Sequence, residues 1–420
     1  MLIILSSALM LGIGPSRSSG ERSDALLGRA LVFSPSLDDA QQEVLHELPW
    51  NVLPERDHPA PNASSVQAKE RTKALEERIS GLTPERLHER IWNVSVLGRI
   101  SQQNQFFFRA TGLLQLRPEL STSLIPLFDD DAMTYEGRTF IVDLLVGAGH
   151  GEAQRVLQTL LESESLKRKK FYPILFQRIS WVTNPEPALV AFTAAEYADL
   201  KTVPYVTVDE PGDTEMSDEA APQESKAFRK LASIYALGSV VGNLYRTERQ
   251  GLALEYNGWL LHDLRRATTL REKEAYLAAI GNAGLQGNGT TVLAYVSHPE
   301  SALRRTAADA LRQTNTKSAR TALLKLLTDR DLQVQQRALA SLTPVSLGGQ
   351  EMQAVAQMVA RGKTNAGLDA SLVAFFARQA PAPELAQPAL VAMLNRHTGD
   401  GQLEARINTL YGELQRRVHP

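Results

Sequence analysis

Apolar residues recur at helical spacing along most of the chain. In the segment REKEAYLAAIGNAG, Tyr276, Leu277 and Ile280 fall on one helical face, and the surrounding Lys, Glu and Ala residues favour a helix. Asn184-Pro185-Glu186 is typical of a helix start, because proline fits the first helical turn. Strand patterns are nearly absent, and only residues 203–208 (VPYVTV) have β character. The pattern therefore predicts an all-α chain.

Two segments of the C-terminal half repeat each other at an offset of 31 residues: VLAYVSHPESALRRTAADAL (292–311) and LLKLLTDRDLQVQQRALASL (323–342). The matched apolar positions are Leu293 with Leu324, Val296 with Leu327, Leu303 with Val334, Ala307 with Ala338, Ala308 with Leu339 and Leu311 with Leu342. Each unit reads as a short helix, a polar turn and a second helix with small residues. Because such units bury their apolar faces only against neighbouring units, we predict a right-handed α-solenoid, a horseshoe of HEAT-like helix pairs, over residues 66–420.

Three other segments differ from this pattern. Residues 1–20 include the apolar run MLIILSSALMLGIGPS, which has the length of a signal-peptide core. We interpret them as an export signal or tether; an ordinary buried N-terminal helix or a misplaced start codon is the alternative. Residues 21–65 mix helical patterns with proline breakers, and residues 202–225 carry seven acids and no basic residue. This last composition predicts a disordered acidic loop inserted between two helices.

The composition of the chain limits the partners and the kinds of site that we expect. The chain has 43% hydrophobic and 22% charged residues, as folded proteins do, and a formal net charge of −2. Such a charge gives no broad cationic field, so we do not expect a nucleic-acid partner. The absence of cysteine excludes disulfides, thiolate metal sites and a cysteine nucleophile. It fits both the cytoplasm and an envelope compartment; with the leader, we expect a periplasmic, envelope-associated or secreted protein, and the cytoplasm stays open.

Residues 284–291 read G-x-x-x-x-G-T-T, one residue away from a phosphate-binding loop. Thr290 stands where that loop needs lysine, and a helix rather than a strand is predicted before it. We therefore interpret the segment as a turn between helix pairs, with the preceding helix ending at Asn282 or Gly284.

Two His-Glu dipeptides, His46-Glu47 and His88-Glu89, occur in the echoes LHELPW and LHERIW. Such dipeptides resemble the iron ligands of helical-repeat hydroxylases similar to deoxyhypusine hydroxylase, and imidazole with carboxylate suits non-haem iron. That family needs four dipeptides and this chain has two. We therefore predict no metal, no cofactor and no catalysis, with an iron-dependent hydroxylase as the alternative.

A basic run, Lys167, Arg168, Lys169 and Lys170, precedes Phe171 and Tyr172. A solvated helix face is one interpretation of this run. Contact with an anionic headgroup, an acidic partner or the acidic loop of the chain itself is the other.

Several segments together resemble the helical domain of the large lipid transfer proteins, namely the vitellogenins, apolipoprotein B and the microsomal triglyceride transfer protein. SIYALGSVVGNLY (233–245) is similar to the family's YGSLV helix, and the later IGNAG (280–284) is similar to its ALGNAG helix end. Residues 140–163 and 184–197 are similar to earlier repeats of the family's helical domain. The resemblance covers about residues 85–345, and its segments occur in the same order along the chain.

The resemblance implies a helical horseshoe that surrounds lipid-binding β-sheets and follows a β-barrel in the chain. This sequence has no barrel-length β segment before residue 85 and no sheet pattern after residue 345, and the family's disulfide cysteines are missing. We therefore expect a non-enzymatic scaffold whose concave face binds a protein partner, β-rich and lipid-associated, in an extracytoplasmic lipid-transport system. Apart from the leader, no stretch is apolar enough to span a membrane.

Overall fold

The structure of the chain is a computed structural model. The structure describes residues 87, 104–130, 133–167, 169, 171–204, 222–379, 383–397 and 401–418. Within these residues the regular elements are α-helices and 3-10 helices, and no strand is present. The prediction of an all-α chain is confirmed for the described part. The predicted segments 1–20 and 21–65, and most of residues 203–208, lie outside it.

The first half of the described chain forms a series of short and medium helices. They are α6 (Asn104–Leu116), η4 (Pro118–Phe128), α7 (Tyr135–Ala148), α8 (Gly151–Glu162), α9 (Glu164–Lys167), α10 (Tyr172–Arg178), η5 (Ile179–Trp181), α11 (Pro187–Leu200), α12 (Pro222–Arg246) and α13 (Gln250–Arg266). Helix α12 begins inside the predicted acidic loop 202–225, so the last four residues of that segment are helical. Proline at this position supplies a backbone already suited to a first helical turn.

The second half continues the series to the C-terminal end. Its elements are α14 (Leu270–Ala283), η6 (Gln286–Asn288), α15 (Gly289–Leu293), α16 (Ser301–Ala310), η7 (Leu311–Gln313), α17 (Lys317–Leu326), α18 (Leu332–Leu342), α19 (Gly349–Ala360), η8 (Ala366–Leu368), α20 (Asp369–Gln379), α21 (Pro383–Arg396) and α22 (Gly401–Val418).

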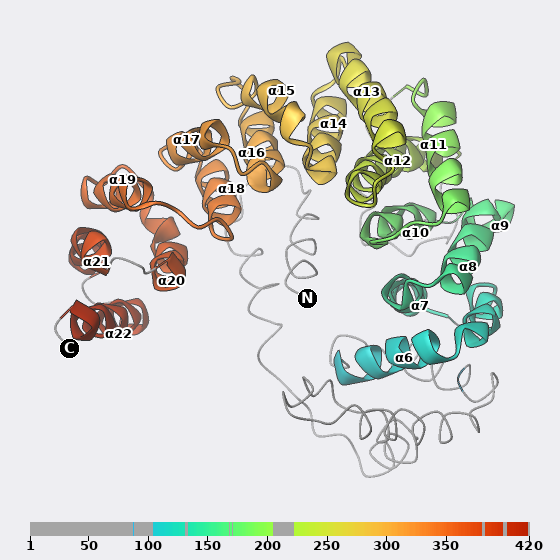
Figure 1. Cartoon of the computed structure of the whole chain (residues 1–420), viewed down its shortest axis with the longest axis horizontal. Helices are drawn as coiled ribbons and strands as arrows, with labels where there is room; N and C mark the ends of the chain where they lie inside the picture. The colour runs from blue at the N-terminus through green and yellow to red at the C-terminus, as the bar shows by residue number, and fades with distance from the viewer. Residues whose placement is uncertain are drawn as a thin grey trace, which may run out of the picture.

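The helices follow an arc in two layers (Figure 1). Helices α10, α12, α14, α16, α18 and α20 lie on the inner side of the arc, and each packs against the next. Helices α11, α13, α15, α17 and α19 lie on the outer side. The apolar core is continuous between the two layers, so each pair is buried by its neighbours along the arc.

Local capping residues set the ends of the helices in the repeated region. The side chains of Thr269, Thr316 and Asp331 accept hydrogen bonds from backbone N–H groups in the first turns of α14, α17 and α18. Helix α14 ends at Gly284, whose φ of 64° lies in the left-handed region that glycine adopts without strain. The predicted helix end at Gly284 is confirmed.

The apolar positions matched at an offset of 31 residues are the positions that the structure buries. The buried pairs are Val296 with Leu327, Leu303 with Val334, Ala307 with Ala338, Ala308 with Leu339 and Leu311 with Leu342. The first pair, Leu293 with Leu324, is half-buried and packs against the edge of the same core. The repeat in the sequence therefore records a repeated packing environment.

Candidate interaction surface

The inner helices α14, α16 and α18 present their polar residues on the side opposite to the core. In α16, Arg305 and Asp309 lie about half a helical turn away from the buried Leu303 and Ala307, at about 100° per residue. Since the core lies between the two helix layers, this polar side faces the inside of the arc (Figure 1). The inner side of these helices is thus a candidate surface for another molecule.

Ion pairs connect this surface from helix to helix. Glu274 of α14 lies 3.6 Å from Arg305 of α16, and Asp309 of α16 lies 3.5 Å from Arg337 of α18. Arg312, in η7 directly after α16, donates to the Asp309 carboxylate at 2.7 Å. The pKa of Glu274 is raised because burial disfavours its charged form, although Arg271 and Arg305 act in the opposite direction.

Small residues allow the inner helices to approach closely. A Cβ atom on Gly238 of α12 would lie 2.2 Å from the carbonyl oxygen of Ala279 in α14. A Cβ atom on Gly281 of α14 would lie 2.5 Å from the Cα atom of Ala310 in α16. The two segments that resemble the lipid transfer proteins, around Gly238 and Gly281, therefore both act in packing neighbouring inner helices.

The segment similar to a phosphate-binding loop, residues 284–291, takes part in this helix packing. The buried amide of Asn288 exchanges two hydrogen bonds of 2.9 Å with the buried amide of Asn257, which lies on α13. A side chain on Gly284 would collide with Gln313. The turn connects helix pairs, as interpreted from the sequence, and the buried Asn288 side chain of the turn is directed into the protein.

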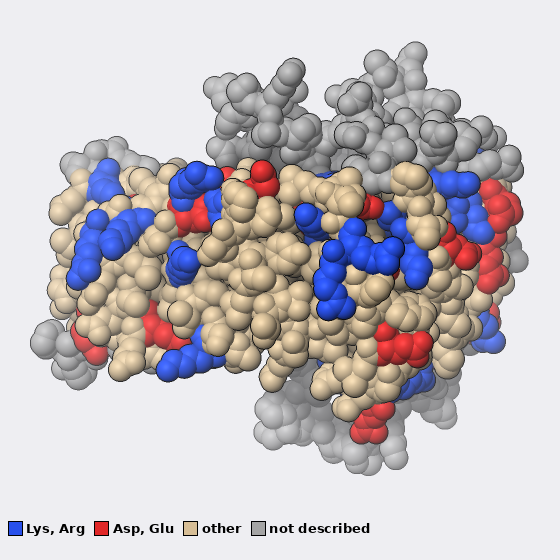
Figure 2. All heavy atoms as spheres, turned by 90° about the horizontal axis from the view of Figure 1, so that it is seen from above, with Lys and Arg blue, Asp and Glu red and all other residues tan. Residues whose placement is uncertain are grey.

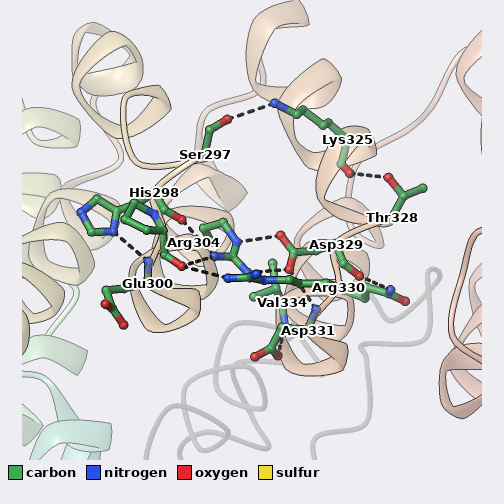
Figure 3. Close-up of polar contacts among 12 residues, drawn as sticks. Ser297, His298, Glu300, Arg304, Lys325, Thr328, Asp329, Arg330, Asp331 and Val334 are labelled. Carbon is green, nitrogen blue, oxygen red and sulfur yellow. Dashed lines mark hydrogen bonds and ion pairs between the residues drawn. The ribbon is translucent and has the colours of Figure 1, made fainter.

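A buried ion pair joins two successive turns of the repeat. Arg304 donates through Nε and Nη2 to both carboxylate oxygens of Asp329, at 2.7 and 2.8 Å (Figure 3). Its Nη1 donates to the carbonyl oxygens of His298 and Pro299 in the preceding turn, at 2.9 and 2.8 Å. Burial tends to raise the pKa of Asp329, but hydrogen bonds from Arg304 and from the Asp331 N–H lower it overall.

Side chains at equivalent repeat positions make similar connections. Gln335, 31 residues after Arg304, accepts a 3.0 Å hydrogen bond from the Asn365 N–H of the next turn. Gln154 accepts one of 2.8 Å from the Glu186 N–H. The sequence interpretation missed these residues. For Arg304 and Gln335 the repeat itself contains the signal, because these two buried polar residues recur at the same offset as the apolar ones.

A second buried polar cluster joins α11, α13 and α14. The hydroxyl of Tyr197 donates to the Asp263 carboxylate and is hydrogen-bonded to Tyr276. Burial raises the pKa of Tyr276 to about 12, so its hydroxyl stays protonated at neutral pH. Lys230 of α12 similarly donates to Glu272 of α14 at 2.6 Å. These groups have hydrogen-bond partners in neighbouring helices, and their arrangement stabilises helix packing.

The other site residues predicted from the sequence are described only in part. His46, Glu47, His88 and Glu89 lie outside the described residues. Within the part that is described, no group of three His, Cys, Asp or Glu residues could hold a metal ion. Arg168 and Lys170 are also outside it.

In the basic run, Lys167 donates to Glu164 at 2.8 Å, and its side chain is 20% exposed. The positive charge of Lys167 is therefore compensated locally, by a residue one helical turn earlier on α9.

The outer side of the arc carries dispersed charge. Figure 2 shows separate groups of basic and acidic side chains there, with uncharged surface between them.

Among the helices that the structure describes, none combines the length and the apolar character needed to cross a bilayer.

Comparison with known proteins gives one informative result. A family model described as the vitellogenin TPR domain matches residues 119–365, which is more than half of the chain. No curated protein matches the sequence. The match begins in η4 and ends just before η8, so it includes the whole inner surface formed by α14, α16 and α18.

Proposed function

The chain belongs to the vitellogenin TPR domain family, and on that premise we propose that it is a non-enzymatic scaffold for a protein partner. In this proposal the helix pairs form a right-handed, HEAT-like α-solenoid, and the partner binds the inner side of the arc. The partner is β-rich and lipid-associated, and the complex belongs to an extracytoplasmic lipid-transport system. Vitellogenin-like domains are typically extracellular or secreted, which supports that location.

The observation that carries the proposal is that the helices bury their apolar surface between the two helix layers. The inner and outer helices bury apolar residues in one shared core, for example Leu303 of the inner helix α16 and Leu323 of the outer helix α17. The inner face of α14, α16 and α18 is therefore polar. Such a face suits a protein surface better than a lipid tail, which needs an enclosed apolar site.

Photo-crosslinking tests the proposal in the organism that makes the protein. A photoreactive phenylalanine derivative is placed at Gln336, an exposed residue on the inner helix α18, and at Glu255, an exposed residue on the outer helix α13. We expect one prominent protein adduct from Gln336 and none of comparable yield from Glu255. Adducts from the outer position alone would contradict an inner binding face.

Two measurements on the purified chain separate this function from its alternatives. Lipid extraction and mass spectrometry should detect no stoichiometric lipid, and metal analysis of protein produced with iron present should detect no stoichiometric iron. One bound lipid per chain would show that the protein carries cargo itself. Stoichiometric iron lost on replacing His46 and His88 by alanine would instead support the hydroxylase.

A further inference from the structure

Residues 256–378 carry an excess of exposed positive charge that the net charge of the whole chain does not show. This part of the sequence has 15 basic and nine acidic residues, a formal charge of +6, whereas the whole chain has −2. All of these residues belong to the described part, and among them Glu300 is the only exposed acidic residue. The exposed basic residues are Arg265, Arg266, Lys317, Lys325, Arg330, Arg361, Lys363 and Arg378. The electrostatic potential outside this part of the array is therefore positive.

The acidic residues of the same region mostly serve contacts inside the fold. Asp369 is fully buried and pairs with Arg396 at 3.0 Å. Asp329 accepts two hydrogen bonds from Arg304, and the Asp331 side chain caps the first turn of α18. Because these carboxylates have partners within the helix array, the basic residues remain in excess at its surface.

Six of the eight exposed basic residues lie along one edge of the array, where outer helices lead into inner helices. They occupy the ends of α13 and α17 and the turns that precede α18 and α20. Arg361 stands 31 residues after Arg330, so the edge follows the repeat. We call this surface the basic edge, and its members are Arg265, Arg266, Lys325, Arg330, Arg361 and Lys363.

Hydrogen bonds hold successive turns of the basic edge side by side. Arg330 donates to the Pro299 carbonyl oxygen at 3.4 Å, and Lys325 donates to the Ser297 hydroxyl at 3.0 Å, so both reach the turn before α16 (Figure 3). Gln335 hydrogen-bonds to the turn before α18 and to the turn before α20. The charges of three successive repeat units therefore form one row.

The charges of the basic edge are not neutralised within the fold. The acceptors of Arg330 and Lys325 are an uncharged carbonyl oxygen and a hydroxyl. Arg330 also lies within electrostatic reach of Asp329, but that carboxylate is hydrogen-bonded to Arg304. Within the described residues, none of the six side chains of the edge forms an ion pair. The row therefore presents net positive charge to solvent.

The spacing and the neighbours of these charges fit the surface of an anionic lipid layer. The basic groups come from turns one repeat apart and do not converge on one point, whereas a lipid layer offers many mobile phosphate groups. Leu270, which follows the basic end of α13, is 41% exposed, and an exposed leucine beside basic residues is typical of proteins that lie on membranes. Single-stranded nucleic acid is usually bound on exposed aromatic side chains, and residues 256–378 expose none.

We propose that the basic edge binds the surface of an anionic lipid layer, with Arg330, Arg361 and Lys363 contacting phosphate groups and Leu270 entering the interfacial region. The edge lies at the ends of the helices, whereas the inner face follows their length, so the inner face stays accessible while the edge is bound. This inference goes beyond the scaffold function: it states on what surface the scaffold works and does not depend on the partner.

Flotation with lipid vesicles tests the basic edge on the full chain. One set of vesicles contains phosphatidylcholine alone, and the other contains equal parts of phosphatidylcholine and phosphatidylglycerol. R330Q/R361Q/K363Q removes three charges from the edge. The matched control, also three exposed basic residues but outside the edge, is R249Q/K317Q/R406Q.

We expect the protein to float with the anionic vesicles and to stay behind with the neutral ones. R330Q/R361Q/K363Q should bind the anionic vesicles at least about tenfold more weakly, because each basic residue near the surface adds to the attraction, while the control variant binds as the parent does. R330K/R361K keeps the charge and should retain most of the binding. Added salt should weaken binding. Melting curves show that each variant is folded.

Equal binding to both kinds of vesicle would overturn the inference, as would an equal loss in the two glutamine variants. Displacement from the vesicles by millimolar inorganic phosphate would also overturn it, because the edge would then hold a discrete phosphate site. Tighter binding of a thymidine oligonucleotide or of polyglutamate would replace the lipid by that polymer.

Crosslinking from Gln336 remains a separate readout of the scaffold function. A partner adduct there without binding to anionic vesicles refutes the basic edge and leaves the scaffold function standing. Binding to anionic vesicles without an adduct refutes the scaffold function and leaves the basic edge standing.

Discussion

Replacing Gly238 by alanine should destabilise the protein, although the same change stabilises an ordinary helix. Gly238 lies in α12, and its Cβ atom would be placed 2.2 Å from the carbonyl oxygen and 2.6 Å from the Cα atom of Ala279 in α14. Both are backbone atoms, so no side chain can rotate away. The helices must separate by roughly 1 Å to restore ordinary contact.

Two opposing effects set the magnitude. Alanine improves helix propensity by about 1 kcal/mol relative to glycine. Overpacking typically costs about 1–3 kcal/mol, and a clash with backbone places this site at the upper end of that range. The expected net loss is about 2 kcal/mol. For a cooperative unit of about 150–250 residues this lowers the melting temperature by roughly 4–8 °C.

Gly258 provides the matched control. It lies within α13, is exposed, and no atom lies within 4 Å of the Cβ it would gain. G258A should therefore raise stability by about 1 kcal/mol, the propensity effect alone. Thermal unfolding followed by circular dichroism at 222 nm compares the two variants with the parent protein. A G238A melting temperature equal to or above that of G258A would refute the close packing of α12 on α14.

Further predictions concern the core, the buried amides and pH. Leu342 is fully buried, so L342A should lower the free energy of unfolding, measured in urea, by about 2–5 kcal/mol. An unchanged free energy would show that the repeat register is wrong. N257A should cost about 1–3 kcal/mol because it leaves the Asn288 amide buried without its partner, and the N257A/N288A pair should cost less than the sum of the single changes in a double-mutant cycle. The pKa of Asp329 is lowered in the folded state, so its stabilising contribution is present above its unfolded pKa of about 3.9 and is lost as pH falls through the folded value. D329N should be less stable at pH 7 because Arg304 loses its counter-charge, and it should show a weaker loss of stability on acidification; parallel curves for both proteins would contradict this. ATP should leave the melting temperature unchanged, and a shift abolished by a change in the glycine-rich turn would contradict our interpretation of that turn.

Local residues were sufficient to predict the helices and the repeat. Apolar spacing identified α14 and the matched pairs of α16 and α18, and a left-handed glycine ended α14 at Gly284 as expected. These features depend on residues within a few turns of each other, so one sequence contains them. The resemblance to the vitellogenin family, from residues 233–245 and 280–284, was likewise confirmed by the family match.

Polar pairing was not predicted, because its partners come from different helices. Tyr197 pairs with Asp263, 66 residues away, and Arg304 reaches Asp329 across a helix pair. A tyrosine or an arginine in an isolated helical pattern reads as a solvated or core residue. Only its position against a neighbouring helix shows which acceptor it meets.

By itself the sequence determined helix positions, the 31-residue period and the apolar face that each helix buries in the core. These follow from backbone preferences and from the burial of apolar side chains. The tertiary structure decided what the small and charged residues do. Stacking brings Gly238 against Ala279, and it places arginines of α14, α16 and α18 on one surface beside the less exposed Glu274 and Asp309. The physical reason is distance: burial is a property of one residue, whereas close approach and charge pairing exist only between helices that folding has brought together.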